Sequence, residues 1–350
     1  MDLKVNHLQL PIPRSYIEAL IELLQIQGVP PHKWIPTHHL EILTHEKSTV
    51  WFNPEDFQAL LLSANLNWGK PHLGFYLGER LGLGTHGLVG QTLSQSKNLE
   101  EALQTLERFS ILQFPLIQFS ILHSPKRIEL HFQVVFPKGD ASRIIIDAAV
   151  VSLKNLFQDL SSQGGLGIEV HFQSELKIPR SLIKELIASP IHFDDSWEGL
   201  SFDATEARSS LRMADSNAFS AGSSLCKKQL ENLSATLSYS NQVRRQLWMR
   251  PGRFPSLKGI SRLLNIHSRT LHRRLLDEGT SYRCLLEEVR LEFAKSYLQK
   301  SSLSTEETAH ALGYSDVSNF RRALIRMTGS SPRKLRGKPK IRRELNTRVK

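Results

Sequence analysis

Apolar positions in the last third of the chain recur at helical spacing, stop at a short polar break, and then recur again. In the first such stretch the break spans residues 265–268, so the pattern predicts two short helices joined by a sharp turn. A second stretch repeats the arrangement, with Gly313 at its turn. The defining apolar residues are Leu257, Ile260, Leu263, Leu264, Leu271 and Leu275, then Ala309, Leu312, Phe320, Leu324 and Met327. We therefore predict two consecutive helix-turn-helix motifs between Pro255 and Arg336.

The second helix of each predicted motif has a basic outer face. With Leu271 facing inward, a rotation of about 100° per residue directs the charged residues of the first motif to the solvated side. Such a helix fits the major groove of DNA, where arginine can bond guanine edges and serine or histidine can make smaller contacts. Most charged helix faces are only solvated, so the duplication is the feature that favours DNA. The predicted base-reading residues are Arg269, His272, Arg273, Ser318, Arg321 and Arg322.

The segments before, between and after the two motifs predict how the motifs are positioned. Residues 282–300 form one long predicted helix, which can place both reading helices in successive major grooves about 34 Å apart on one face of a duplex. Residues 241–250 predict a first helix of the same domain, and the turn 251–255 ends it. The tail 337–350 is basic and has no periodicity, so we expect either salt-sensitive phosphate contacts or a disordered end without function.

These residues resemble the AraC/XylS family of bacterial transcription regulators. The resemblance rests on LGYSDVSNFRRALIRMTGSSPRKLR in the second motif and on SRTLHRRLLDEGTSY in the first. Six positions depart from the family pattern, mainly in packing: Ser261, Asn265, His267, Leu324, Met327 and Leu335. Two of these lie at the turn of the first motif. Asn265 replaces a glycine and should adopt the same left-handed turn, and His267 replaces a capping serine, so Ser268 should take over the cap.

The preceding two thirds of the chain predict a domain that mixes helices and strands. Amphipathic helices are predicted at 15–27, 54–67, 72–82 and 98–109, a long helix at 141–160 and a shorter one at 180–188. Residues 115–122 and 127–136 alternate apolar and polar and predict an antiparallel pair. Further strands are predicted at 168–172, 190–193 and 199–203. The fold class is thus an α+β domain with a mixed or antiparallel sheet, followed by an all-α domain.

The first part also contains GLVGQTLSQSKNLEEALQTLERF at 87–109, VHFQSELKIPRSLIKELIASPIHFDDSWEGLSF, and LRMADSNAF at 211–219. By these motifs, in this order, it resembles the arabinose-binding-like effector domain that accompanies one branch of the same family, over about residues 14–232. The resemblance implies a pocket for a small organic effector, formation of a homodimer, and contact with RNA polymerase. It names neither the effector nor its pocket residues. The predicted organisation is an effector-binding and dimerisation domain at 1–232, a serine-rich linker at 233–240, a DNA-binding domain at 241–336 and the tail at 337–350.

Charge separates the two predicted domains. The net charge is +11, but residues 241–350 hold 25 lysines and arginines against 9 aspartates and glutamates, whereas residues 1–240 hold 20 against 25. A basic surface confined to one domain favours a nucleic-acid partner over a membrane. The two cysteines, Cys226 and Cys284, lie in no metal or disulfide pattern. No signal peptide or membrane-spanning run is apparent, so we expect a soluble, cytoplasmic protein.

Other motifs favour no catalytic or cofactor site. GLGTHG at 82–87 fits a dinucleotide-binding pattern but follows a predicted helix instead of a strand, so we expect no cofactor. His38, His39 and His45 lack the spacing of metal ligands, and we expect no metal. Neighbouring carboxylates such as Asp194 and Asp195 more often solvate a turn than catalyse. An enzyme is therefore not expected.

The sequence as a whole predicts a sequence-specific transcription regulator on double-stranded DNA, modulated by an effector bound in the first domain. The alternative is an effector-independent architectural protein that coats DNA with little sequence preference. Competition with scrambled duplex separates the two.

Overall fold

The computed structural model divides into two compact units, Met1–Gln242 and Val243–Lys350. Each unit is described by itself. No helix in the described part of the chain combines the length and apolarity needed to cross a lipid bilayer. The structure describes residues 10–44, 49–134, 139–161, 166–173, 183, 185, 187–193, 195, 197–236, 238–248, 250, 252–300 and 303–335.

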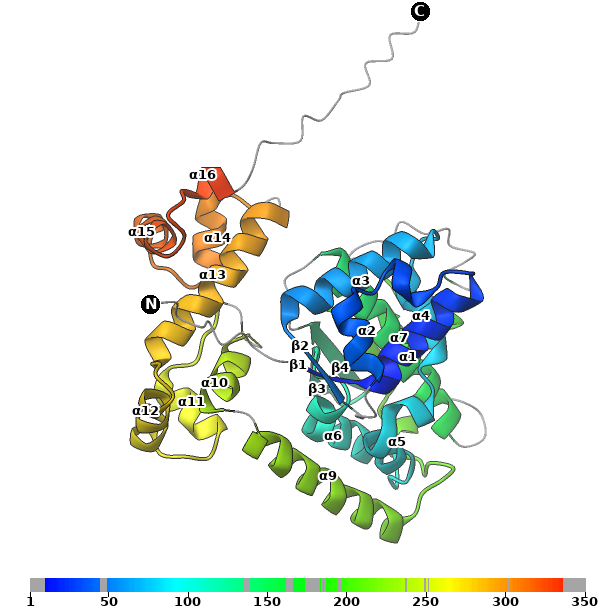
Figure 1. Cartoon of the computed structure of the whole chain (residues 1–350). Helices are drawn as coiled ribbons and strands as arrows, with labels where there is room; N and C mark the ends of the chain where they lie inside the picture. Colours follow the sequence, from blue (N-terminus) through cyan, green and yellow to red (C-terminus); the bar gives the residue numbers. More distant parts are fainter. Residues whose placement is uncertain are drawn as a thin grey trace, which may run out of the picture. The chain divides into compact units, whose positions relative to one another are not determined.

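Unit 1 is built on a mixed five-stranded sheet with the order β3-β4-β7-β5-β6 (Figure 1). Only the β5–β6 pair is parallel among the strand pairs described. A separate antiparallel pair joins β1 and β2, with Leu10 opposite Phe52. The strands are β1 (Leu10–Pro13), β2 (Thr49–Phe52), β3 (Ile117–His123), β4 (Arg127–Val134), β5 (Glu169–His171), β6 (Ile191–His192) and β7 (Gly199–Asp203).

Alternation along the strands gives the sheet one apolar and one polar face. Ile128 and Leu130 of β4 pair with Phe202 and Leu200 of β7, and all four side chains are buried. The opposite face carries Arg127, Glu129 and His131 from β4 and Ser201 from β7, together with residues of β5 and β6. This polar face is called the polar sheet face below.

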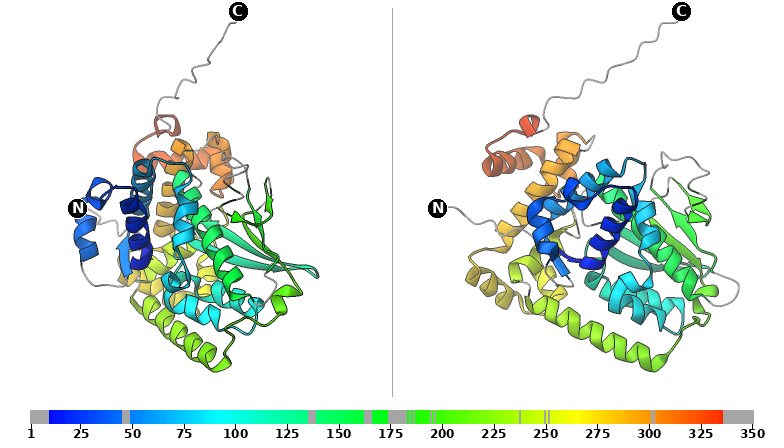
Figure 2. Two further views of the ribbon diagram at one scale, coloured as in Figure 1. Left: turned by 90° about the vertical axis from the view of Figure 1, so that its right-hand side faces the viewer. Right: turned by 45° about the vertical axis from the view of Figure 1, so that its right-hand side comes forward.

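Helices cover the apolar side of the sheet (Figure 2). Helix α7 packs against β4 and β7, and α4 packs on α7. The helices of unit 1 are α1 (Arg14–Ile26), α2 (Thr37–Thr44), α3 (Pro54–Trp68), α4 (Leu73–Arg80), α5 (Gly87–Ser94), α6 (Leu99–Phe109), α7 (Asp140–Leu160) and α9 (Ser216–Thr236), with 3-10 turns η1 (Pro31–Lys33), η2 (Leu83–His86), η3 (Ser110–Leu112) and η4 (Glu206–Arg208).

Two glycines set the spacing between α4 and α7. A Cβ atom at Gly74 would lie 2.5 Å from the carbonyl oxygen of Ile144, and one at Gly78 would lie 2.6 Å from that of Ala148. Because the two glycines are one turn apart, they form a continuous strip on which the α7 backbone lies directly. The two helices are therefore in backbone contact.

The predicted elements of this domain are largely confirmed. The long helix at 141–160 is α7, the antiparallel pair is β3 and β4, and the later strands are β5, β6 and β7. Several residues of the predicted helix at 180–188 lie outside the described residues. The segment 233–240, predicted as a linker, includes the end of α9 at Thr236 and the start of α10 (Tyr239–Trp248). Its role as a linker remains a prediction.

Unit 2 contains the two predicted helix-turn-helix motifs. Motif 1 consists of α11 (Leu257–Leu263) and α12 (Ser268–Asp277), and motif 2 of α14 (Thr305–Ala311) and α15 (Val317–Thr328). The long helix α13 (Tyr282–Lys300) connects them, and α16 (Pro332–Leu335) follows. At about 1.5 Å per residue, the 19 residues of α13 span roughly 28 Å. The tail 337–350 lies outside the described residues.

The turn of motif 1 confirms one local prediction and corrects another. Asn265 has φ +53°, the left-handed conformation that glycine would adopt. Ser268, however, does not cap α12, because the cap position is His267, which makes no side-chain capping bond. The Ser268 hydroxyl instead bonds to the buried Ser261 hydroxyl at 2.7 Å. The Ser261–Ser268 pair thus connects the two helices of the motif.

Candidate DNA-binding interface and effector cavity

Helix α12 is anchored by two side chains and leaves its basic face in solvent. Leu271 and Leu275 are almost fully buried, and burial of a leucine is worth about 1.5–3 kcal/mol. Arg269, His272 and Arg273 are all exposed, as predicted from the helical period. Within the described residues, none of these three takes part in an ion pair. Their side chains are therefore available to an external partner.

Helix α15 presents the second basic face. Phe320 and Leu324 are buried, while Ser318, Arg321 and Arg322 are exposed. The helix is capped at its start by Asp316, whose carboxylate accepts the backbone N–H of Asn319 at 2.7 Å. The predicted base-reading residues are thus exposed on both helices, and Figure 1 shows α12 and α15 on the same side of α13.

One of these arginines is held in place by its own helix. The Arg322 guanidinium donates to the Asn319 side-chain oxygen at 2.6 Å, and the Asn319 amide in turn donates to the Asp316 carboxylate. These two hydrogen bonds restrict the Arg322 side chain before it binds, so binding costs it less conformational entropy. Asn319 was not among the predicted residues, although its position one turn before Arg322 on an exposed face could have indicated it.

Helix α13 carries a cluster that joins the two motifs, and we call Gly252, Phe254, Arg290, Gly313 and Tyr314 the motif brace. The Arg290 guanidinium lies 5.4 Å from the Phe254 ring centroid and 4.7 Å from that of Tyr314. It also donates to the Gly313 carbonyl at 3.4 Å. Phe254 belongs to the turn before motif 1, and Tyr314 to the turn of motif 2. One α13 side chain therefore contacts both motifs.

The backbone of the motif brace also brings the turn at Gly252 into close contact with motif 2. Gly252 has φ +78°, and a Cβ atom there would lie 2.4 Å from the Ala311 carbonyl oxygen. The hydroxyl of Tyr282, at the start of α13, donates a hydrogen bond to the Pro255 carbonyl at 2.6 Å and so fixes the end of the same turn. The sequence had indicated the turn at 251–255 only as the end of a helix. Its docking against motif 2 is a structural finding.

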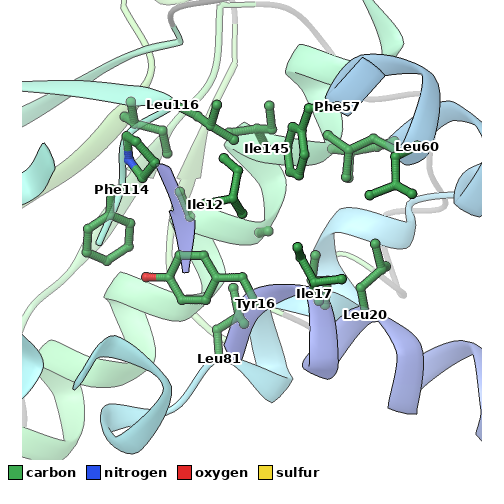
Figure 3. A pocket seen from close by; sticks show the side chains of 17 residues that line it. Ile12, Tyr16, Ile17, Leu20, Phe57, Leu60, Leu81, Phe114, Leu116 and Ile145 are labelled. Carbon is green, nitrogen blue, oxygen red and sulfur yellow. The ribbon is translucent and has the colours of Figure 1, made fainter. Parts of the chain in front are cut away.

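Unit 1 contains a cavity of about 80 Å³ among core side chains (Figure 3). It lies between α1, α3, α4 and α7, beside the chain that enters β3. One water needs roughly 10–15 Å³, and a cavity with apolar walls does not hold water well. The lining residues are Ile12, Tyr16, Ile17, Leu20, Phe57, Leu60, Leu61, Leu77, Leu81, Phe114, Pro115, Leu116, Ile117, Ile144, Ile145, Ala148 and Ala149.

Tyr16 is the single polar side chain of this lining, and its hydroxyl proton already makes a hydrogen bond to His86. Ser152 donates to the Leu81 carbonyl at 2.8 Å, so its oxygen accepts from His86 Nε2, also at 2.8 Å. His86 Nδ1 is then the acceptor for the Tyr16 hydroxyl at 2.8 Å. Burial lowers the pKa of His86 to about 4, so the ring is neutral at pH 7 and the chain keeps this direction.

Comparisons with known proteins agree with this geometry. Residues 40–211 match the family model described as the arabinose-binding domain of AraC transcription regulator, and residues 260–338 match a helix-turn-helix domain model. The ornithine utilization regulator of Pseudomonas aeruginosa is 30% identical over 334 residues, which cover 94% of this chain and 97% of that protein. The chain belongs to the AraC family of transcription regulators. It is accordingly a DNA-binding regulator and not an enzyme.

Other relatives of this AraC-family regulator are more distant. The transcriptional regulator VqsM of Pseudomonas aeruginosa is 25% identical over 275 residues, which cover 75% of this chain and 83% of VqsM. The solved structure of the transcriptional regulator CdpR, also from Pseudomonas aeruginosa, aligns with a TM-score of 0.46 at 24% identity, over 92% of this chain and 98% of that one.

The regulator has a second, more polar hollow at the C-terminal ends of α4 and α7. This cleft of about 420 Å³ is lined by Glu79, Lys154, Asn155, Gln158 and Asp159 among others. Lys154 is 6% exposed, and burial lowers its pKa, while Asp159 and Glu79 act in the opposite direction. The ammonium group donates to the Asn155 side-chain oxygen at 3.1 Å. The cleft therefore offers both charges to a ligand.

The motifs that predicted no catalytic site have structural roles in the regulator. GLGTHG forms the η2 turn and the start of α5, and its His86 belongs to the Tyr16 hydrogen-bond chain. Among the described members of the histidine group, His39 is buried and stacks on Phe52. His45 and Asp194 lie outside the described residues. A different His and Glu cluster, which the sequence did not indicate, lies on the polar sheet face.

Proposed function

We propose that this regulator reads specific DNA sequences through α12 and α15, and that a small effector bound in unit 1 changes its DNA affinity. The supporting observation is the pair of exposed basic helices on one side of α13, with the motif brace between them. A flexible connection would leave the two helices free to bind DNA separately, whereas a braced pair favours one spacing of base contacts. That spacing is the basis of sequence preference here.

The effector that the unit 1 cavity favours is apolar. Its walls are aliphatic and aromatic, and the Tyr16 proton is held by His86, so a charged ligand would lose its hydration without compensation. The cavity suits a short acyl chain or one aromatic ring, at about 25 cal/mol per Å² of apolar surface removed from water. Ala148 and Ala149 line it from α7, next to the α4 contact.

Filling the cavity should abolish effector binding. The variant Ala149→Leu places a larger side chain in the cavity, so the probe toluene, a single uncharged ring, should no longer bind to it. In the unchanged protein, toluene should bind and alter operator affinity by roughly 5–150-fold, the usual range of allosteric coupling. Titration calorimetry and DNA-binding anisotropy measure the two effects.

The matched control is Lys154→Met, which lies on the same helix but lines the polar cleft instead of the cavity. It should retain probe binding and the response of operator affinity to toluene. A cooperative thermal transition must be present in both variants. Unchanged probe binding by Ala149→Leu, or loss in Lys154→Met alone, would contradict the apolar cavity as the effector site.

The polar cleft supports a second effector chemistry, that of a charged amino acid. Lys154 can pair with a carboxylate, and Glu79 with Asp159 can pair with amino groups. A relative at 30% identity bears the name ornithine utilization regulator, so L-ornithine is the appropriate probe. An L-ornithine response that Lys154→Met removes and Ala149→Leu retains would assign the effector to the cleft.

The family resemblance also supports a homodimer and a contact with RNA polymerase. Sedimentation velocity of the full chain, with and without operator, measures the first. Co-precipitation of polymerase with the DNA-bound regulator measures the second.

A further inference from the structure

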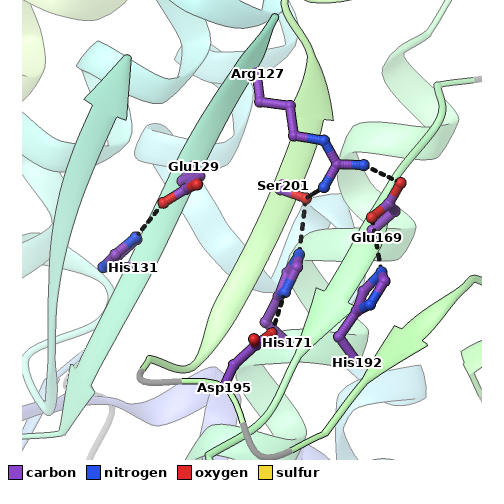
Figure 4. Close-up of polar contacts among 8 residues, drawn as sticks. All are labelled: Arg127, Glu129, His131, Glu169, His171, His192, Asp195 and Ser201. Atoms are coloured by element: carbon purple, nitrogen blue, oxygen red, sulfur yellow. Dashed lines mark hydrogen bonds and ion pairs between the residues drawn. The ribbon is translucent and has the colours of Figure 1, made fainter. Parts of the chain in front are cut away.

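The polar sheet face brings together a Glu and two His residues from distant parts of the chain. Glu169 and His171 lie on β5, and the parallel pairing of β5 with β6 places His192 directly beside His171 (Figure 4). His192 Nε2 lies 2.8 Å from Glu169 Oε2. One ligand atom from each of the three residues lies within 4.8 Å of the others. These are the donor types that Zn²⁺ and similar ions prefer.

His171 is oriented by a second carboxylate. Its Nδ1 lies 2.6 Å from Asp195 Oδ2, and its Nε2 lies 2.8 Å from the Ser201 hydroxyl. A carboxylate on one ring nitrogen fixes the histidine and leaves the other nitrogen to coordinate a metal. The Ser201 hydroxyl is the group that would have to turn away.

Both oxygens of Glu169 have partners. Arg127 contacts Oε1, and Oε2 faces His192 Nε2, the ring nitrogen with which it would share the ion. Among the described residues in contact around the cluster, the carboxylates Glu169, Asp195 and Glu129 outnumber the guanidinium of Arg127. A bound divalent cation would balance this excess of acidic groups.

We propose that Glu169, His171 and His192 bind one divalent transition-metal ion of the zinc class, with Asp195 as the residue that positions His171. Ligand bonds of about 2.0–2.2 Å place ligand atoms roughly 3–3.5 Å apart, so separations that reach up to 4.8 Å must shorten by at most about 1.3–1.8 Å. His192 is exposed on an edge strand and can make this movement. The two imidazole rings are 12° from parallel, and each must tilt toward the ion.

Three protein ligands leave at least one coordination position for water or an anion. The ion would also link β5 to β6, because its ligands come from both strands of this short parallel pair. Metal binding should therefore raise the thermal midpoint of unit 1. This site is independent of the effector cavity, which lies on the opposite side of the sheet from the polar sheet face.

The test is a titration of the metal-free, untagged full chain with Co²⁺, followed by competition with Zn²⁺. The expected result is one Co²⁺ per chain with a visible absorption band that Zn²⁺ removes. Glu169→Gln and His192→Ala should each lose the band. Asp195→Asn should retain the site but bind the ion about 10–100-fold more weakly, as for other residues that orient a ligand.

His131→Ala is the matched control. His131 lies on the same face, bonds to Glu129 at 2.8 Å and stacks on Trp197, yet it is not part of the three-residue cluster. This variant should bind Co²⁺ like the unchanged protein. The proposal is overturned if the unchanged protein shows no stoichiometric Co²⁺ band, if His192→Ala binds equally well, or if His131→Ala loses binding to the same extent. Circular dichroism confirms that each variant is folded.

Discussion

Replacing Arg273 with alanine is expected to weaken binding to the operator by about 1–3 kcal/mol, or roughly 5–150-fold, because a bidentate arginine–guanine contact is worth that much. Arg273 is exposed on the outer face of α12 and makes no ion pair within the described residues. Its loss should affect random duplex far less. Operators selected from a random-sequence library, followed by fluorescence anisotropy on selected and scrambled duplexes, measure the difference.

The control for Arg273→Ala is Arg283→Ala, which removes the same charge from α13. Arg283 is highly exposed and lies near Glu287, so it contributes to the general field and not to the outer face of α12. It should weaken both duplexes by a similar, smaller factor. Equal losses on both duplexes for Arg273→Ala would leave only a phosphate contact there. Failure to select any preferred sequence would favour the architectural alternative.

Replacing Gly252 with alanine is expected to disrupt the motif brace and to cost about 2–5 kcal/mol. The left-handed conformation costs an L-residue roughly 1–2 kcal/mol, and overpacking adds typically 1–3 kcal/mol. The Cβ would lie 2.4 Å from a backbone oxygen at Ala311, which cannot rotate away as a side chain could. Calorimetry of the full chain should show a lower transition for unit 2, together with weaker operator binding.

Gly279→Ala is the matched comparison for this second prediction. Gly279 has φ +73°, close to the value at Gly252, but nothing lies within 4 Å of the position a Cβ would take. The variant Gly279→Ala therefore has the energetic cost of a left-handed backbone conformation but no steric clash. Similar destabilisation by the two variants would show that the close approach of the 252–254 turn to motif 2 contributes nothing. Arg290→Met should share the effect of Gly252→Ala on operator binding.

Local patterns predicted much of this molecule. The 3.6-residue period identified α7 and the recognition helices, and alternation identified the β3–β4 hairpin, because both signals lie within one element. The strand β1 was missed because its sequence LPIP contains two prolines, which fit a strand only at an edge or a start. The exposure of Arg269 and Arg273 followed from the same helical period as the core.

Contacts between distant segments could not be predicted in this way. The β5–β6 pairing joins residues about 20 positions apart, and the pattern of a single strand does not identify its partner, so the Glu169–His171–His192 cluster had no sequence signature. The motif brace depends on Gly252, Arg290 and Tyr314, which are separated by more than 20 residues each. Tyr16 and His86 meet for the same reason. Such pairs require the fold itself.

The backbone contact at Gly74 and Gly78 has a consequence for how unit 1 can respond to a ligand. Helices α4 and α7 cannot separate gradually, because at Gly74 and Gly78 helix α4 contributes no side chain that could readjust against the α7 backbone. Helix α1 is tied to α7 through the Tyr16–His86–Ser152 chain. Of the helices that wall the cavity, α3 alone has neither constraint, so a ligand larger than the cavity should displace α3 outward, and the caps at Asn53 and Gly69 would act as its pivots.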